Sequence, residues 1–206
     1  MDGNIKKPKT KLYNQTDGIY GQKNEDMVEW GSMRFNPPYQ WDVHPNREWF
    51  GLMQLIWSLD LPKKAVMIEI GTYAGESTAM FASSGKFKQI HTIDPYDIPN
   101  GINVQMEAKI NCRYWDYIQF WRNYSFDCHH CFKDGMFDFV YIDGDHTGEA
   151  VARDIDLFMP KVRKGGYIGG HDYNPGWWPE VVLAVNEKLQ GKMIQTFDDK
   201  SWVTRV

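Results

Sequence analysis

The stretch MIEIGTYAGESTAM, residues 67–80, runs from a short apolar segment through a glycine turn into small residues that can begin a helix. A chain passes from strand to glycine turn to helix where its backbone approaches a compact polar ligand, because glycine has no side chain to prevent the approach. The same passage is the first part of a parallel βαβ unit when a second strand follows. The stretch therefore predicts a ligand site and an α/β fold together.

Strand-like apolar runs alternate with helical patterns from residue 46 to the end of the chain. The predicted helices are residues 46–60, 75–84, 101–112, 147–162 and 179–191. The predicted strands are residues 65–70, 89–94, 117–125, 137–143 and 165–170, followed by a hairpin of 192–197 and 201–206. This alternation predicts an α/β fold with a doubly wound, mostly parallel sheet, whose ligands bind beyond the carboxyl ends of the strands.

Residues 1–45 are polar and are interrupted by Gly, Asn and Pro. The segment FNPPYQW cannot form a regular helix or a central strand, because proline lacks the backbone donor that both require. We expect an irregular N-terminal arm before a domain at 46–206. The aromatic residues of the arm are compatible with a cover over an active site and equally with a strap packed on the domain surface.

Composition excludes several classes of protein. The chain has 206 residues, of which 42% are hydrophobic, and this suits one domain with its own core. The net charge of −4 offers no basic field for nucleic acid, and no apolar run approaches the roughly 18 residues of a membrane span. The first residues lack the apolar segment of a secretory signal, and three cysteines are too few for a disulfide framework. We therefore expect a reduced, cytoplasmic protein that binds neither nucleic acid nor membranes.

The glycine turn differs from the dinucleotide fingerprint G-x-G-x-x-G. Its pattern is Glu69-x-Gly71-x-x-x-Gly75, with an acidic residue at the end of the strand. Asp94 closes the next predicted strand, where a carboxylate can accept both hydroxyl hydrogens of a ribose. These features favour a nucleoside ligand, and the alternative is a tight turn that binds nothing.

A second group of ionisable residues follows two later strands. Asp143, Asp145 and His146 come after residues 137–142, and His171 and Asp172 come after residues 165–170. Adjacent strands bring these three carboxylates and two imidazoles to one rim, where leaving them buried and unpaired is costly. A divalent cation or a charged substrate would relieve that cost. In the alternative, the aspartates cap the following segments and the histidines pack as polar residues.

Two parts of the chain resemble a known family. EIGTYAGES followed by HTIDPYD resembles motifs I and II of the class I S-adenosylmethionine-dependent methyltransferases. FDFVYIDGDHTGEAVARDIDLFMPKVRKGGYIGGHDY resembles the second half of the small O-methyltransferases that use a divalent metal, in the branch with D-G-D-H and G-H-D-Y motifs. The resemblance covers residues 65 to about 190. It implies a seven-stranded Rossmann-like sheet with an antiparallel C-terminal hairpin, and methyl transfer from S-adenosylmethionine to a hydroxyl of a small molecule.

The resemblance also implies site residues. Those that would hold S-adenosylmethionine are Glu69, Gly71, Thr72, Tyr73, Gly75, Ser77, Asp94, Ser125 and Asp143. Within this set, Thr72 and Tyr73 would line the pocket for the methionine half. Asp94 would hold the ribose, and Ser125, at the end of the third predicted strand, would lie near the adenine.

The resemblance implies a metal site with Asp143, His171 and Asp172 as ligands. Other metal-dependent members have an Asp-Asn pair where this chain has His171 and Asp172. Carboxylate oxygens suit magnesium or manganese, whereas an imidazole suits zinc, manganese or iron better. His146, three residues after Asp143, would be the general base, and the alternatives for it are a helix-start residue or a further metal ligand.

Two other functions are compatible with such a sheet. One is a nicotinamide-dependent oxidoreductase, against which the missing G-x-G-x-x-G argues. The other is a non-catalytic cofactor-binding module, against which Asp143 and His146 argue. The acceptor class (sugar, phenol or another hydroxyl) stays open, as does assembly into a homo-oligomer. Trp177 and Trp178 follow the HDYNPG loop, where they could stack on a flat ring or a sugar face or pack against the arm.

Overall fold

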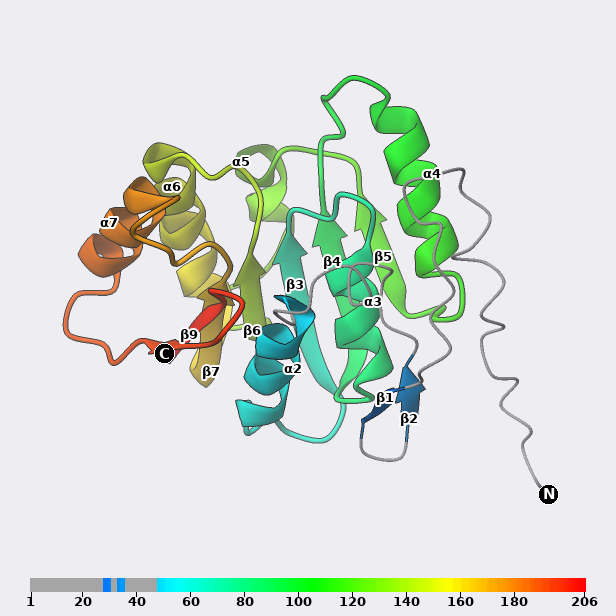
Figure 1. Ribbon diagram of the computed structural model, residues 1–206, viewed down its shortest axis with the longest axis horizontal. Helices are drawn as coiled ribbons and strands as arrows, with labels where there is room; N and C mark the ends of the chain where they lie inside the picture. The colour runs from blue at the N-terminus through cyan, green and yellow to red at the C-terminus, as the bar shows by residue number, and fades with distance from the viewer. Residues whose placement is uncertain (1–27, 31–32, 36–47) are drawn as a thin grey trace.

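The computed structural model describes residues 28–30, 33–35 and 48–206 (Figure 1). Two three-residue strands, β1 (Val28–Trp30) and β2 (Met33–Phe35), pair antiparallel. They lie in the segment expected to be irregular, so that expectation is wrong for these two strands. The rest of the predicted arm, and its proposed role as a cover, lie outside the described residues.

A seven-stranded sheet occupies the centre of the domain in Figure 1, with the order β5-β4-β3-β6-β7-β9-β8. Its strands are β3 (Ala65–Ile70), β4 (Phe87–Ile93), β5 (Ile118–Trp121), β6 (Phe137–Ile142), β7 (Val162–Gly170), β8 (Gln195–Thr196) and β9 (Trp202–Arg205). Strands β3 to β7 pair in parallel, whereas β9 runs antiparallel to β7 and forms a hairpin with β8. The predicted fold, a doubly wound and mostly parallel sheet with an antiparallel C-terminal hairpin, is confirmed.

Helices cover both faces of this sheet. They are α2 (Glu48–Ser58), α3 (Glu76–Ser83), α4 (Gly101–Asn111), α5 (Ser125–Cys128), α6 (Gly148–Phe158) and α7 (Pro179–Lys188), with 3-10 turns η2 (His129–Cys131) and η3 (Met159–Lys161). Among the described residues, none of these helices is long and apolar enough to cross a membrane.

The core has two halves because successive strand residues point to opposite faces. Met67 and Tyr141 pack with the apolar residues of α2 and α3 on one face. Ile68 and Val140 pack with those of α6 and α7 on the other. The central strands are buried on both faces, which explains why they read as continuous apolar runs in the sequence.

The strand order reverses between β3 and β6. The chain passes from β3 outward to β4 and β5, then returns to place β6 on the other side of β3. The loops after β3 and β6 therefore diverge, and ligands of open α/β sheets bind in such a crevice. Glu69 of the glycine turn lies at the end of β3, and Asp143 of the second ionisable group follows the end of β6.

Several predicted boundaries are wrong. The third strand ends at Trp121 rather than at Ser125, because the chain turns and begins α5 at Ser125. Helix α6 ends at Phe158, since Pro160 cannot continue it, and β7 begins as early as Val162. Strand β8 is limited to Gln195–Thr196.

Candidate active site

The glycine turn after β3 depends on two left-handed backbone positions. Gly71 has a φ of 96° and Gly75 a φ of 77°. A Cβ atom at Gly71 would lie 1.9 Å from the backbone oxygen of Asp143, so no larger residue fits there. The turn thereby brings the end of β3 directly against the end of β6, and Gly75 caps the start of α3.

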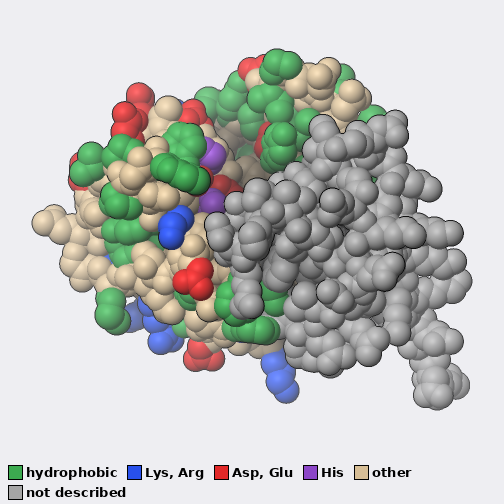
Figure 2. All heavy atoms as spheres, in the orientation of Figure 1, with side chains coloured by type: hydrophobic (Ala, Val, Ile, Leu, Met, Phe, Trp, Pro, Cys, Tyr) green, Lys and Arg blue, Asp and Glu red, His purple; other side chains and the backbone are tan. Residues whose placement is uncertain are grey.

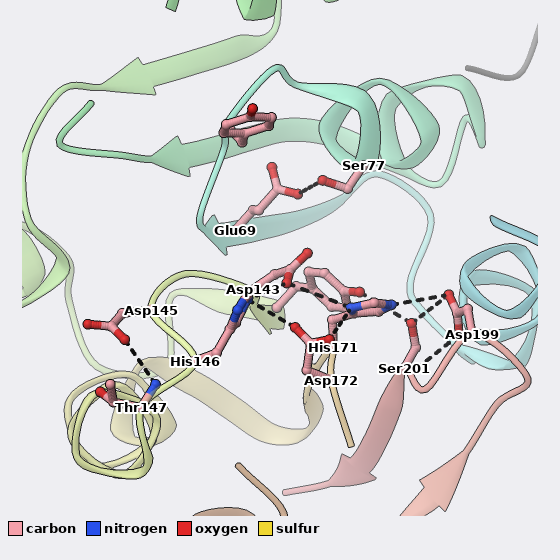
Figure 3. Close-up of polar contacts among 12 residues, drawn as sticks. Glu69, Ser77, Asp143, Asp145, His146, Thr147, His171, Asp172, Asp199 and Ser201 are labelled. Atoms are coloured by element: carbon pink, nitrogen blue, oxygen red, sulfur yellow. Dashed lines mark hydrogen bonds and ion pairs between the residues drawn. The ribbon is translucent and has the colours of Figure 1, made fainter. Parts of the chain in front are cut away.

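Glu69 holds this turn from beneath. Its side chain is fully buried, and its carboxylate accepts a hydrogen bond from Ser77 Oγ (2.6 Å, Figure 3). It also accepts hydrogen bonds from Thr92 Oγ1 (2.8 Å) and from the hydroxyl of Thr78. Burial raises the pKa of Glu69 to about 7, although the three hydroxyls favour its charged form. Glu69 therefore ties β3 to α3 and β4 and shapes the turn without lining a cavity.

Asp94 organises the loops at the end of β4. Its Oδ2 accepts a hydrogen bond from the backbone N of Tyr73 (2.9 Å), and its Oδ1 accepts one from the backbone N of Tyr96 (2.7 Å). Both tyrosines have positive φ values, 44° and 53°, and the carboxylate stabilises these unusual conformations. Each oxygen keeps a second lone pair, so Asp94 can still accept hydrogen bonds from a ligand hydroxyl.

A cavity of about 570 Å³, here called the donor cavity, lies between the glycine turn, the end of β4, α5 and the loop after β6. Tyr124 and Phe126, whose rings stack with centroids 5.0 Å apart, form part of its wall. Figure 2 shows histidine and acidic side chains at the bottom of a hollow on this face of the molecule. The wall thus offers aromatic surface for a flat ring and carboxylates for polar groups.

The donor cavity is strongly acidic. The carboxylates that line it belong to Asp94, Asp97, Asp143, Asp145 and Asp154. Arg153 is the only arginine or lysine among the described lining residues, and its buried Nε has no hydrogen-bond partner there. Glu76 stands in the first turn of α3, where a dinucleotide protein would bind pyrophosphate. This charge pattern favours a nucleoside with a positively charged tail over a pyrophosphate.

The structure brings together some of the predicted donor residues and separates others. Those that line the donor cavity are Gly71, Tyr73, Asp94, Ser125 and Asp143. Thr72 does not, because its side chain is buried and its Oγ1 lies 2.6 Å from that of Thr92, so the expectation that it lines the pocket is wrong. Ser77 lies in the first turn of α3 as expected, with its hydroxyl directed to Glu69.

The aromatic wall and the partner of Ser125 were not predicted from the sequence. Ser125 Oγ donates a hydrogen bond to Asp154 Oδ1 (2.6 Å), a buried carboxylate of α6. Tyr124 and Phe126 flank Ser125 directly, so two aromatic residues around a predicted adenine contact were the available signal.

The second ionisable group forms a compact cluster. Asp143, His146 and Asp172 each offer a ligand atom, and these atoms lie within 4.8 Å of one another. His146 Nε2 is 2.9 Å from Asp172 Oδ2 and 3.6 Å from Asp143 Oδ1 (Figure 3). His171, the predicted third ligand, lies at the same rim, with its Nδ1 3.9 Å from Asp143 Oδ1 and 3.3 Å from Asp172 Oδ1. The turn after β6 directs His146 to the same carboxylates, so either imidazole can complete a set of three ligands, and the choice of His171 stays a prediction.

His171 lies beside the cluster and connects it to the C-terminal hairpin. Its Nδ1 is 3.3 Å from Asp172 Oδ1, and its Nε2 is 4.0 Å from Asp199 Oδ2. Asp199 in turn accepts hydrogen bonds from the backbone N and the hydroxyl of Ser201, both at 2.9 Å (Figure 3). Asp199 and Ser201 were not predicted, because nothing in the sequence indicates that the β8–β9 turn reaches this rim.

Residues 68–173, just over half of the chain, match the model of a family described as a methyltransferase domain. The chain belongs to this methyltransferase family. The prediction of a class I methyltransferase is thereby confirmed, and the oxidoreductase alternative is set aside. Both glycines of the turn, Asp94 and the Asp143–Asp172 rim lie inside the matched segment.

Solved structures share the fold of the chain, and one sequence relative matches part of it. Rv0187 from MTB, solved with a cofactor, has 18% identity and a TM-score of 0.57, with 80% of each chain covered. An O-methyltransferase from Bacillus cereus, solved with SAH, has 17% identity and a TM-score of 0.56, with 80% of this chain and 82% of that one covered. These similarities support the fold. The uncharacterized protein R132 of Acanthamoeba polyphaga mimivirus is 34% identical over 128 residues. The match covers 58% of this chain and 57% of R132, so this chain spans little more than half of that relative.

The rim of the methyltransferase has perturbed protonation equilibria. Hydrogen bonds with Asp143 and Asp172 raise the pKa of His146 to about 10. Burial alone would lower the pKa of His171, but the neighbouring carboxylates raise it to about 9. Burial would raise the pKa of Asp172, yet the two histidines hold it below its usual value. In the metal-free protein the carboxylates therefore favour the protonated form of both imidazoles.

This arrangement predicts how the stability of the metal-free methyltransferase depends on pH. Since folding raises the pKa of His146, its contribution is fully present below the ordinary value of 6.5 and is lost as pH rises towards about 10. The side chain is 35% exposed, so we expect a screened contribution of about 1 kcal/mol. Urea unfolding in the presence of a chelator, at pH 6.5 and pH 10, should give a smaller difference between wild type and His146→Gln at the higher pH. A difference that stays constant would contradict the ion pair.

Proposed function

We propose that the protein transfers a methyl group from S-adenosylmethionine to a hydroxyl oxygen of a small molecule. One observation carries the proposal: Asp143 and His146 belong to the ionisable cluster and also line the donor cavity. A group that can bind a proton is thereby held at the end of the cavity that fits the donor. A non-catalytic binding module would gain nothing from that coincidence.

The donor cavity fits S-adenosylmethionine by shape and charge. Tyr124 and Phe126 offer a wall against which an adenine can stack, and Asp94 can accept hydrogen bonds from a ribose. S-adenosylmethionine supplies a methyl group on a positively charged sulfonium. Asp143 at the end of β6 suits such a charge, since opposite charges attract strongly in a partly buried site.

His146 is the proposed general base. The acceptor hydroxyl must lose its proton as its oxygen attacks the methyl, and an imidazole at the rim can take that proton. The two carboxylates beside His146 hold its proton firmly while their charge is uncompensated. The same carboxylates also fix the ring in place, through the 2.9 Å contact with Asp172.

The rim suits a divalent cation. Asp143 and Asp172 contribute carboxylate oxygens within reach of one another, a donor set that suits magnesium or manganese, with an imidazole beside them. The cation would act as a Lewis acid on the acceptor hydroxyl. It would also offset the two carboxylates and so lower the pKa of His146 towards the range in which a histidine is a useful base.

Asp94→Ala tests the donor site. We expect wild type to bind S-adenosylhomocysteine but not NAD. The substitution should weaken the binding of S-adenosylhomocysteine by about 1.5–3 kcal/mol, because hydrogen bonds to a charged group are lost. Isothermal titration calorimetry measures both. Asp116→Ala, an exposed carboxylate before the amino end of β5, is the matched control and should bind normally. Binding of NAD without binding of S-adenosylhomocysteine would refute the proposal.

The acceptor is proposed to be a small molecule and not a nucleic acid, in line with the net charge of −4 and the acidic rim. Structural neighbours include O-methyltransferases, from Bacillus cereus and from Klebsiella pneumoniae (putative), and an N-methyltransferase, NodS from Bradyrhizobium japonicum, so the choice of oxygen rests on the rim, where His146 can take a hydroxyl proton.

A further inference from the structure

A second cavity, also of about 570 Å³, opens on the other side of His146. It is formed by the turn after β6 and by the start of α7, and the proposed chemistry does not use it. His146, Gly144 and Asp145 line both this cavity and the donor cavity. A molecule in the second cavity would therefore have one end at the rim where the methyl group is transferred. We refer to it as the acceptor cavity.

Two tryptophans give the acceptor cavity its aromatic wall. Trp177 is 81% exposed and Trp178 is 38% exposed, although indoles usually bury most of their surface. The ring of Trp178 lies 4.8 Å from the imidazole of His146, so it continues the wall to the rim. Two accessible indoles at the mouth of a cavity provide a surface for a ligand.

Two carboxylates give the cavity its charge. Asp145 Oδ1 accepts a hydrogen bond from the backbone N of Thr147 (2.9 Å), and Glu180 Oε2 accepts one from the backbone N of Gly148 (3.3 Å). Each bond uses one oxygen and leaves the other available. Within the described part of the chain, no lysine or arginine lies within 4.0 Å of either carboxylate. Among the described residues that line the cavity, only His146 can carry a positive charge, and it already contacts Asp172.

The cavity also lies at the starts of α6 and α7, and helix N-termini attract anions. Here side chains of the protein already satisfy the two helix N-termini. The Thr147 side chain accepts a hydrogen bond from the backbone N of Ala150 (3.3 Å), Glu180 receives the bond from Gly148, and Glu149 and Glu180 add negative charge to the two first turns. The carboxylates of the cavity would repel an anionic ligand, so the local charge favours a cation.

We propose that the acceptor cavity selects substrates that carry a positively charged amine on the same scaffold as the hydroxyl to be methylated. The ammonium group lies against the faces of Trp177 and Trp178, and the free oxygens of Asp145 and Glu180 neutralise it. Aromatic faces attract cations through their quadrupole, and nearby carboxylates add to that attraction. The inference rests on the proposed methyl transfer, since it takes His146 to be the reacting end of the site.

Three probes of nearly equal shape test the charge preference. Tyramine carries an ammonium group, 4-ethylphenol is neutral, and 4-hydroxyphenylacetate is anionic. In ligand-observed NMR titrations we expect tyramine to bind at least about fivefold more tightly than 4-ethylphenol, and 4-hydroxyphenylacetate to bind most weakly. Glu180→Gln and Trp177→Ala should each reduce the preference for tyramine. Glu187→Gln, an exposed carboxylate near the other end of α7, should leave it unchanged.

Equal affinities for tyramine and 4-ethylphenol would overturn the inference. So would tighter binding of 4-hydroxyphenylacetate, which would identify an anion site at the helix starts, and so would the absence of binding by all three at millimolar concentration. Titration of the same samples with S-adenosylhomocysteine separates the two claims. If S-adenosylhomocysteine binds normally but the three probes show no charge preference, only the proposal for the acceptor cavity is refuted. If S-adenosylhomocysteine does not bind, the proposed donor site is refuted.

Discussion

Replacement of His146 by alanine is expected to lower turnover by roughly 10²–10⁴-fold, the usual contribution of a general base. Affinity for S-adenosylhomocysteine should change little, because the groups proposed to bind the cofactor, at Asp94 and on α5, remain in place. The wild-type rate should rise with pH as His146 loses its proton, and the variant should lack that rise. Single-turnover rates across the pH range, with an identified acceptor, measure both effects.

His130→Ala is the matched control, since His130 is exposed on the short 3-10 turn η2. Its turnover should equal that of wild type. If His146→Ala instead loses affinity for the cation, His146 is a ligand, as its position in the cluster allows. Turnover within a few-fold of wild type would show that no protein base is required.

Removal of divalent metal is expected to lower activity by at least about 100-fold, because a bound Lewis acid contributes several kcal/mol to charge stabilisation. Magnesium or manganese should restore the activity. Asp172→Asn should weaken the binding of the cation, since it removes a carboxylate within reach of Asp143 and His146. Activity assays after chelation, with metal added back, measure the dependence.

Binding of S-adenosylhomocysteine is the internal control for that experiment. It should survive chelation, because Asp94 and the aromatic wall lie on other strand ends than Asp172. Full activity in metal-stripped protein would contradict the metal site. The contact of His146 with Asp172 would then serve only to orient the imidazole.

The fold was predictable from the sequence because its signals are local. Buried parallel strands such as β3 and β6 appear as apolar runs, and Pro179 and Gly191 mark the two ends of the last helical segment. The ends of the strands were harder to predict from the sequence. Residues 117–125 are rich in aromatic side chains, which favour a strand. The polar pair Arg122-Asn123 stands where β5 ends, but the aromatic Tyr124 follows it, and Ser125 was assigned to a strand end.

The site was predictable only in part. Parallel strands fix which residues reach the rim, and Asp94, Asp143 and Asp172 lie there as this rule predicts, while their roles stay predictions. The direction of a side chain at the rim depends on the turn that follows. For this reason Thr72 turned inward to Thr92, and His146 lies about as close to the two carboxylates as the predicted ligand His171 does. Asp199 arrives from the C-terminal hairpin, and that contact depends on tertiary packing that no local pattern encodes.

A crystal structure with S-adenosylhomocysteine and manganese would test the central claim most directly. The account predicts density for the adenosine between Asp94 and the Tyr124–Phe126 wall, with the sulfur directed towards Asp143 and the metal between Asp143 and Asp172. Density for the nucleoside elsewhere, or a sulfur directed away from Asp143 and His146, would contradict it.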